Sequence, residues 1–272
     1  MSPELHVYLG VLAFVFGAVV GSFLNVCVHR LPREESIVEP PSHCPHCNQR
    51  IYWYDNVPLV SYVALQGRCR HCRKRISPRY FVMELLTAML FLLVWVSFDE
   101  WLIPIYWVIV AGLLVATFID FEHYIIPNGL TIGGTALGLV LSILYPPLQR
   151  ADTVAAAGLQ SLLGVIVGGL LLLVIALVGE KIFKKEAMGM GDVKLMAAIG
   201  AFMGWQATLF TLFVSSILGG IVGLALVLIR RKGWQSRLPY GPYIAFAAMI
   251  WLFCGPAIVK WYFTFLTGEP SS

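Results

Sequence analysis

Four cysteines in this 272-residue sequence have the spacing of a metal site. They form two Cys-x-x-Cys pairs, Cys44 with Cys47 and Cys69 with Cys72, separated by residues 48–68. Four thiolates at this spacing predict a tetrahedral structural zinc centre. A complete set of four ligands would hold the segment together and would not activate water. Two disulfides are the alternative, which a reducing compartment disfavours.

Two aspartates, Asp120 and Asp192, could form a centre of a different kind, because paired carboxylates can act as general acid and general base. Asp192 ends the sequence Gly189-Met190-Gly191-Asp192, whose glycines would let a substrate strand approach the backbone closely. At a helix start, the helix dipole favours the carboxylate anion. The alternatives are a glycine loop with an N-capping aspartate and, for Asp120, a solvated acid at a helix end.

The composition requires that these groups be positioned by membrane helices. The chain is 58% hydrophobic and 12% charged, with a mean hydropathy of +0.79. That is about half the charged fraction of a soluble domain, roughly 25%, and it argues against a soluble enzyme. Residues 153–179 form an uncharged run longer than the roughly 20 residues that a helix needs to cross a bilayer. We therefore expect an all-α polytopic membrane protein.

The positions of the cations predict the topology. Seventeen of the nineteen Lys and Arg residues fall in three segments, Arg30–Arg79, Lys181–Lys194 and Arg230–Arg237. The positive-inside bias places these segments in the cytoplasm. The first apolar stretch, about Leu5 to Val28, lacks a basic n-region, so we interpret it as a retained helix and not as a signal peptide. About eight transmembrane helices result, with both termini outside.

The helices bring both aspartates to the same depth, near the cytoplasmic face. The spans after the first are two between Arg79 and Asp120, Gly129–Leu144, Thr153–Gly179, two short ones in Leu195–Ile229 broken near Gly204 and Trp205, and about Tyr240 to Leu266. Asp120 then lies at the inner end of helix three and Asp192 at the inner start of helix six. The two side chains could therefore face each other. The expected division is a first helix over residues 1–28, a cytoplasmic zinc-binding segment over 29–79, and seven membrane helices over 80–266.

An ordered set of motifs resembles the type IV prepilin peptidases, a family of GxGD-type intramembrane aspartyl proteases. The resemblance covers nearly the whole chain, and the cysteine-containing segment is similar to that of the bifunctional leader peptidase and N-methyltransferase. The motifs are Gly21-Ser22-Phe23-Leu24-Asn25-Val26, Arg30-Leu31-Pro32, Cys44-Pro45-His46-Cys47, Cys69-Arg70-His71-Cys72, Glu84-Leu85-Leu86-Thr87, Asp120 with Pro127-Asn128, Gly189-Met190-Gly191-Asp192-Val193-Lys194, and Pro239-Tyr240-Gly241-Pro242-Tyr243.

The resemblance implies an aspartyl endopeptidase of the bacterial inner membrane. Asp120 and Asp192 would hold a water between them, one carboxylate ionised and the other protonated, because close like charges repel. The implied substrate is a pilin-like precursor with a basic leader ending in Gly, followed by Phe and an apolar helix. Cleavage would occur at the cytoplasmic face. The lipid bilayer is the other expected partner, and the basic loop needs no nucleic acid to explain it.

The resemblance also implies methylation of the new N-terminal Phe by S-adenosylmethionine. The residues carried over for the cofactor are Gly67 and Arg68, at a position where the family commonly has Gly-Lys. Arg keeps the charge but changes the geometry of the group. The sequence lacks a Gly-x-Gly-x-x-Gly fingerprint after a strand, so no Rossmann domain is expected.

Several polar residues keep two interpretations. Glu84, an acid within an apolar helix, could pair with Arg79 or line the active cavity. Asn25 and Asn128 could bond between helices or line the site. A transporter would explain membrane acids but should show inverted repeats, and a non-enzymatic zinc scaffold would leave both aspartates without a role.

Overall fold

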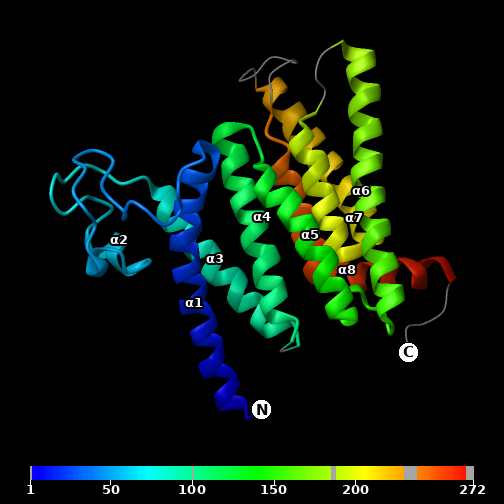
Figure 1. Ribbon diagram of the computed structural model, residues 1–272, viewed down its shortest axis with the longest axis horizontal. Coiled ribbons are helices and arrows are strands. Elements are labelled where there is room, and N and C mark those ends of the chain that lie inside the picture. Colours follow the sequence, from blue (N-terminus) through cyan, green and yellow to red (C-terminus); the bar gives the residue numbers. More distant parts are fainter. Residues whose placement is uncertain (1, 100, 185–187, 230–237, 268–272) are drawn as a thin grey trace. The chain divides into compact units, whose positions relative to one another are not determined.

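The computed structural model describes residues 2–99, 101–184, 188–229 and 238–267. The predicted basic cluster Arg230–Arg237 lies outside these residues. The chain divides into two compact units, residues 1–119 and 120–272, which are described separately. The helices, coloured along the chain in Figure 1, are α1 (Pro3–Arg30), α2 (Val60–Ala64), α3 (Pro78–Ser97), α4 (Ile103–His123), α5 (Asn128–Leu144), α6 (Val154–Phe183), α7 (Met190–Leu228) and α8 (Gly241–Thr267), with short 3-10 turns at Leu31–Arg33, Trp53–Asp55 and Pro146–Gln149.

The helical class agrees with the sequence prediction. Among the described residues, six helices are long and apolar enough to cross a membrane, and α5 is a shorter apolar helix. Because α7 contains a break, counting its halves separately accounts for the eight expected segments. Helix α6 continues to Phe183, beyond Lys181, which the sequence predicted to mark the cytoplasmic boundary, since a charge at a membrane boundary need not end a helix.

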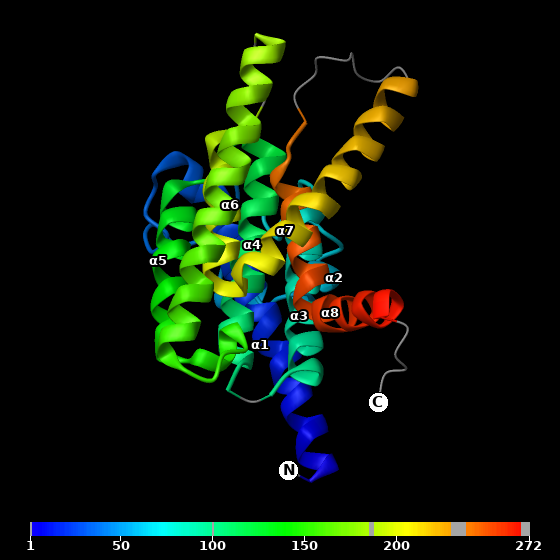
Figure 2. The same ribbon diagram turned by 90° about the vertical axis from the view of Figure 1, so that its right-hand side faces the viewer.

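In the first unit, α1 and α3 pack antiparallel and very close together, side by side in Figures 1 and 2. Small residues on α1 permit this approach. A Cβ added at Gly17 would lie 2.8 Å from Cα of Ala88, and one added at Gly21 would lie 2.8 Å from Cα of Glu84. Asn25 continues the same register, because its Nδ2 donates to the carbonyl of Tyr80 at 3.2 Å.

In the second unit, the close pair is α6 with the first half of α7. Gly164 and Gly200 face each other so closely that a Cβ on either would clash with the backbone carbonyl of the other. The next turn repeats this contact, since a Cβ at Gly168 would lie 2.6 Å from the carbonyl oxygen of Met196. Glycine is therefore required at this crossing, which holds the first half of α7 antiparallel to α6.

Helix α7 is broken at Gly204, as expected from the Gly204-Trp205 pair. Gly204 has φ 79° and ψ 176°, a conformation that favours glycine. Just before the break, the carbonyl of Ala201 accepts three side-chain hydrogen bonds, which satisfy a buried backbone acceptor. The donors are Oγ of Ser142 at 3.0 Å, Nε2 of Gln149 at 2.8 Å and Oγ of Ser161 at 2.6 Å.

The break reverses α7, so that residues far apart along it meet the same part of the fold. A Cβ at Gly191 would lie 3.1 Å from Cβ of Ile126, and one at Gly241 would lie 3.2 Å from Cδ1 of the same side chain. A Cβ at Gly219 would lie 3.3 Å from the Tyr240 ring. The late part of α7 therefore lies against the start of α8, and the early part, which carries Asp192, contacts the same Ile126 side chain as Gly241 of α8.

Candidate active site and metal centre

Asp120 and Asp192 are both buried at helix ends. Asp120 lies in the last turn of α4 and is 5% exposed, whereas Asp192 lies in the first turn of α7 and is 8% exposed. Gly189 is the N-cap residue of α7, and its carbonyl accepts the N–H of Asp192 at 3.1 Å. Burial of a carboxylate at such positions is costly and is characteristic of functional sites.

Asp120 has a backbone donor that sequence reasoning did not identify. The N–H of Gly241, the first residue of α8, donates to Oδ2 of Asp120 at 2.9 Å. First-turn N–H groups have no partner within their own helix and suit a carboxylate acceptor. A Cβ at Gly241 would lie only 2.9 Å from the same oxygen, so glycine permits the approach. In the sequence, the motif Tyr240-Gly241-Pro242 indicates the start of a helix but does not indicate this hydrogen bond.

The side chain of Ile126 contacts residues next to both aspartates. It lies against Gly191, the residue before Asp192, and against Gly241, the donor to Asp120. The backbone next to Asp192 and the backbone donor to Asp120 therefore contact the same side chain. The second unit therefore brings both predicted residues into one buried site, assembled from α4, α7 and α8.

A hydrogen bond between a lysine and an asparagine connects α7 with α5. Nζ of Lys194 donates to Oδ1 of Asn128 at 2.7 Å, which connects the first turn of α7 to the start of α5. Of the two interpretations of Asn128, the structure thus shows the bond between helices. Asn25 likewise bonds between α1 and α3, with its Nδ2 on the carbonyl of Tyr80.

The four predicted cysteines lie together in the first unit. Their Sγ atoms all lie within 4.8 Å of one another. Each pair is formed by the same kind of turn. Asn48 and Arg73, each one residue after a pair, have positive φ angles of 55° and 59°. Two isolated bridges, His43 with Arg50 and Arg68 with Arg75, close the turns.

The chemistry of the cysteine cluster fits a zinc ion. The backbone N–H groups of Cys72 and His71 lower the pKa of Cys69 to about 7, so one thiolate forms readily. At Cys47, the N–H of Gln49 lowers the pKa, but burial and the neighbouring thiols outweigh it and raise the pKa to about 11. A thiolate at Cys47 is therefore unfavourable among the sulfurs alone, and a divalent cation would remove that penalty.

The predicted cofactor residues lie just before the second cysteine pair and differ in exposure. Gly67 is buried and has φ 64°, and a Cβ there would lie 2.9 Å from the Tyr62 ring. Arg68 is exposed. Gly67 thus shapes the turn, and of the two residues only Arg68 can reach a ligand in solvent.

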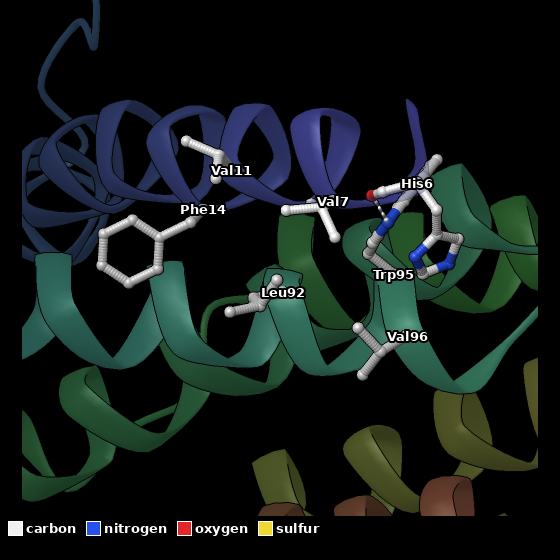
Figure 3. A pocket seen from close by; sticks show the side chains of 8 residues that line it. His6, Val7, Val11, Phe14, Leu92, Trp95 and Val96 are labelled. Atoms are coloured by element: carbon white, nitrogen blue, oxygen red, sulfur yellow. Dashed lines mark hydrogen bonds between the residues drawn. The ribbon is translucent and has the colours of Figure 1, made fainter. Parts of the chain in front are cut away.

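An apolar cavity of about 340 Å³ lies between α1 and α3 (Figure 3). Figure 3 shows Phe14, Leu92 and Val11 around it, and the indole of Trp95 donating to the carbonyl of His6 at 3.2 Å. Its lining contains no carboxylate and no thiol: His6, Val7, Gly10, Val11, Phe14, Leu92, Trp95 and Val96. Among these lining residues only His6 carries a group that could bind a metal ion or move a proton, and one such group does not make a hydrolytic or metal site.

The fold and the paired buried aspartates define an intramembrane protein of the aspartyl-protease type. Comparison with known families agrees with that class. Residues 15–98 match the bacterial peptidase A24 N-terminal domain, and residues 107–224 match the type IV leader peptidase family. The chain belongs to the type IV leader peptidase family.

Full-length relatives carry a more specific name. A prepilin leader peptidase/N-methyltransferase of Aeromonas hydrophila is 37% identical over 284 residues, which cover 93% of each chain. The protein of that name from Myxococcus xanthus is 38% identical over 92% of this chain and 74% of its own. The one from Pseudomonas aeruginosa is 34% identical over 93% of this chain and 95% of its own. No solved structure matches the chain significantly.

Proposed function

We propose that this protein is a membrane aspartyl endopeptidase that removes the basic leader of type IV prepilin-like precursors after Gly, and that it then N-methylates the new N-terminal Phe. The observation that carries the proposal is the meeting of two buried aspartates, Asp120 and Asp192, in one site of a type IV leader peptidase family member.

In the proposed cleavage, Asp120 and Asp192 hold a water between them. The ionised carboxylate accepts a proton from the water as its oxygen attacks the scissile carbonyl. The protonated carboxylate donates a hydrogen bond to the developing oxyanion. The Gly241 N–H fixes the orientation of Asp120 by holding its Oδ2, which leaves the other oxygen for the water or the substrate. The glycines before Asp192 let the extended substrate approach the backbone.

We propose that Cys44, Cys47, Cys69 and Cys72 hold a structural Zn²⁺ ion. Four soft donors within 4.8 Å fit its tetrahedral preference and leave no open position. The ion would fasten the two cysteine turns to each other. In this assignment, residues 29–79 form the zinc-binding segment, and residues 80–266 form the membrane peptidase domain.

For the second activity, S-adenosylmethionine supplies the methyl group when bound. The exposed guanidinium of Arg68 suits its carboxylate, and the buried Gly67 sets the direction of the turn that presents Arg68. The proposed setting is the bacterial inner membrane, with both termini periplasmic and the zinc segment cytoplasmic.

The purified wild-type chain tests both activities in one assay. It is incubated in detergent with a precursor peptide that has a Gly-Phe junction, with and without S-adenosylmethionine, and the products are weighed by mass spectrometry. We expect loss of the leader in both samples and one added methyl only with the cofactor. A precursor with the junction Gly replaced is the matched control. An intact wild-type precursor would refute the peptidase, and cleavage without a methyl gain would refute the second activity.

A further inference from the structure

Glu84 is a buried carboxylate that the proposed peptide hydrolysis does not use. It lies in the second turn of α3 and is 9% exposed, among apolar neighbours of a membrane helix. An acid in such a position is costly and calls for a specific partner. The partner in the structure is neither a metal ligand nor part of the aspartate site.

The carboxylate of Glu84 holds a strained backbone turn outside the helix. Its Oε2 accepts the N–H of Leu59 at 2.7 Å, and the Ser22 hydroxyl also donates to it. Leu59 has φ 63° and ψ −50°, a conformation that a leucine rarely adopts. Such strain persists only where surrounding contacts impose it. The bond to Glu84 is the contact that fixes the Leu59 N–H.

The same turn begins α2, which leads directly to the predicted cofactor residues. Leu59 is the N-cap residue of α2, and the Tyr62 ring in that helix lies against Gly67. The Tyr62 ring also packs on Phe81 of α3, with ring centres 5.4 Å apart. The N–H of Gly67 donates to the carbonyl of Tyr62 at 2.8 Å. Helix α2 is thus held to α3 at two points, and it supports the turn at Gly67.

We propose that Glu84 is a positioning residue for methyl transfer. By binding the Leu59 N–H, it fixes α2 on α3 and thereby fixes where Arg68 stands relative to the membrane helix. This inference rests on the proposed second activity and assigns no role to Glu84 in leader cleavage. Gly21 contributes by letting α1 approach the α3 backbone at Glu84.

Three purified full-length variants test the role. Glu84→Met removes the acceptor while keeping an unbranched chain, and Glu84→Gln keeps an amide oxygen that can accept the Leu59 N–H. Thr87→Val is the matched control, because Thr87 is also a buried polar residue, one turn later, and donates to the Met83 carbonyl of its own helix. The readouts are hydrogen exchange of residues 56–68, zinc content, leader cleavage, and the kcat and KM of methyl transfer on a pre-cleaved peptide.

We expect Glu84→Met to speed exchange of residues 59–67 by about tenfold or more and to lower kcat/KM of methyl transfer by a similar factor. Zinc content and leader cleavage should stay within about twofold of wild type, because neither depends on this bond. Glu84→Gln should recover most of the lost methyl transfer, and Thr87→Val should resemble wild type.

Three results would overturn the inference while wild type still methylates, and two of them concern exchange. One is unchanged exchange in Glu84→Met, which would show that the bond does not hold α2. The other is faster exchange with unchanged methyl transfer, which would show that the held segment does not position the reaction. Equal losses of zinc, cleavage and methyl transfer would indicate general misfolding and would also contradict it. A wild-type protein that never methylates would instead refute the proposed second activity.

Discussion

The cysteine cluster takes its four thiols from residues 44–72, whereas the aspartate site combines α4, α7 and α8, with the Gly241 donor 121 residues from Asp120. Each cysteine pair sits in its own short turn, so local sequence forms most of the metal centre. The aspartate site forms only when several helices have packed. A change far from Asp120 can therefore disturb the aspartate site, while the cysteine cluster depends mainly on its nearest residues.

Of the changes that separate the two centres, loss of the metal should have the largest effect. We expect that effect to be confined to the cysteine segment. We expect Cys69→Ser or a strong chelator to remove the bound zinc and abolish exchange protection over residues 43–76. Structural zinc contributes on the order of 10 kcal/mol to such small folds. Zinc analysis and hydrogen exchange measure the effect. Cys254→Ala is the control, because Cys254 is exposed in α8 and is not a member of the cluster. Full zinc occupancy in Cys69→Ser would contradict the assignment.

A single methyl group at Gly241 should break the aspartate site. The added Cβ would lie 2.9 Å from Oδ2 of Asp120 and 3.2 Å from Ile126, so the carboxylate must move. A misplacement of about 1 Å in an active site costs about 10²-fold in rate. We expect Gly241→Ala to lower kcat of leader cleavage by that factor while zinc content stays constant. Gly220→Ala, where nothing lies within 4 Å of the added carbon, is the control. Equal rates for both variants would contradict the geometry.

The break in α7 supports the aspartate site from a distance, and the hydrogen bonds at the break can be tested by substitution. Gln149→Leu removes a donor to the Ala201 carbonyl and should lower the free energy of unfolding by about 1 to 2 kcal/mol, because a buried hydrogen bond is lost. Thermal unfolding in one detergent measures this change. Thr117→Val, whose hydroxyl bonds only within its own helix turn to Leu113, should change stability less. Equal stability of both variants would show that Ser142 and Ser161 suffice.

The smallest expected effect concerns a polar contact in the cysteine segment. Arg70 donates three hydrogen bonds to Asp55, at 2.6 to 2.9 Å, and they lower the pKa of Asp55. Stabilisation from a lowered pKa is fully present above the unfolded value, about 3.9, and is lost as the pH falls through the folded pKa. We expect Asp55→Asn to be slightly less stable than wild type, by an amount that stays constant from about pH 7 to pH 5. A difference that shrinks within that range would contradict the lowered pKa.

The parts of the molecule that follow from local sequence were predictable. The Cys-x-x-Cys spacing predicted the cluster, and the Gly204-Trp205 pair predicted the break in α7. The positions of the basic residues predicted that Asp120 and Asp192 lie at the same depth and could face each other, because they fix the end at which each helix begins. These inferences needed only spacing, charge and helix length.

The hydrogen bonds from the backbone to Asp120 and to Glu84 were not predictable, because they join residues whose proximity depends on packing. Nothing in the sequence near Asp120 indicates that the N–H of Gly241 will reach it. Glu84 was expected either to pair with Arg79 or to line the active cavity, and its bond to Leu59 depends on a backbone conformation that leucine seldom adopts. A backbone donor leaves no residue type to recognise, so only the folded chain shows it.

The most direct test of the central claim is leader cleavage by Asp120→Asn and Asp192→Asn beside wild type. Each variant keeps the size of the side chain and removes its ability to act as acid or base. With a Gly-Phe precursor in detergent and products weighed by mass spectrometry, the account predicts that each variant cleaves at least about 10³-fold more slowly than wild type. Both variants should still bind zinc and methylate a pre-cleaved peptide. Wild-type cleavage by either variant would contradict the assignment of the two aspartates as the catalytic pair.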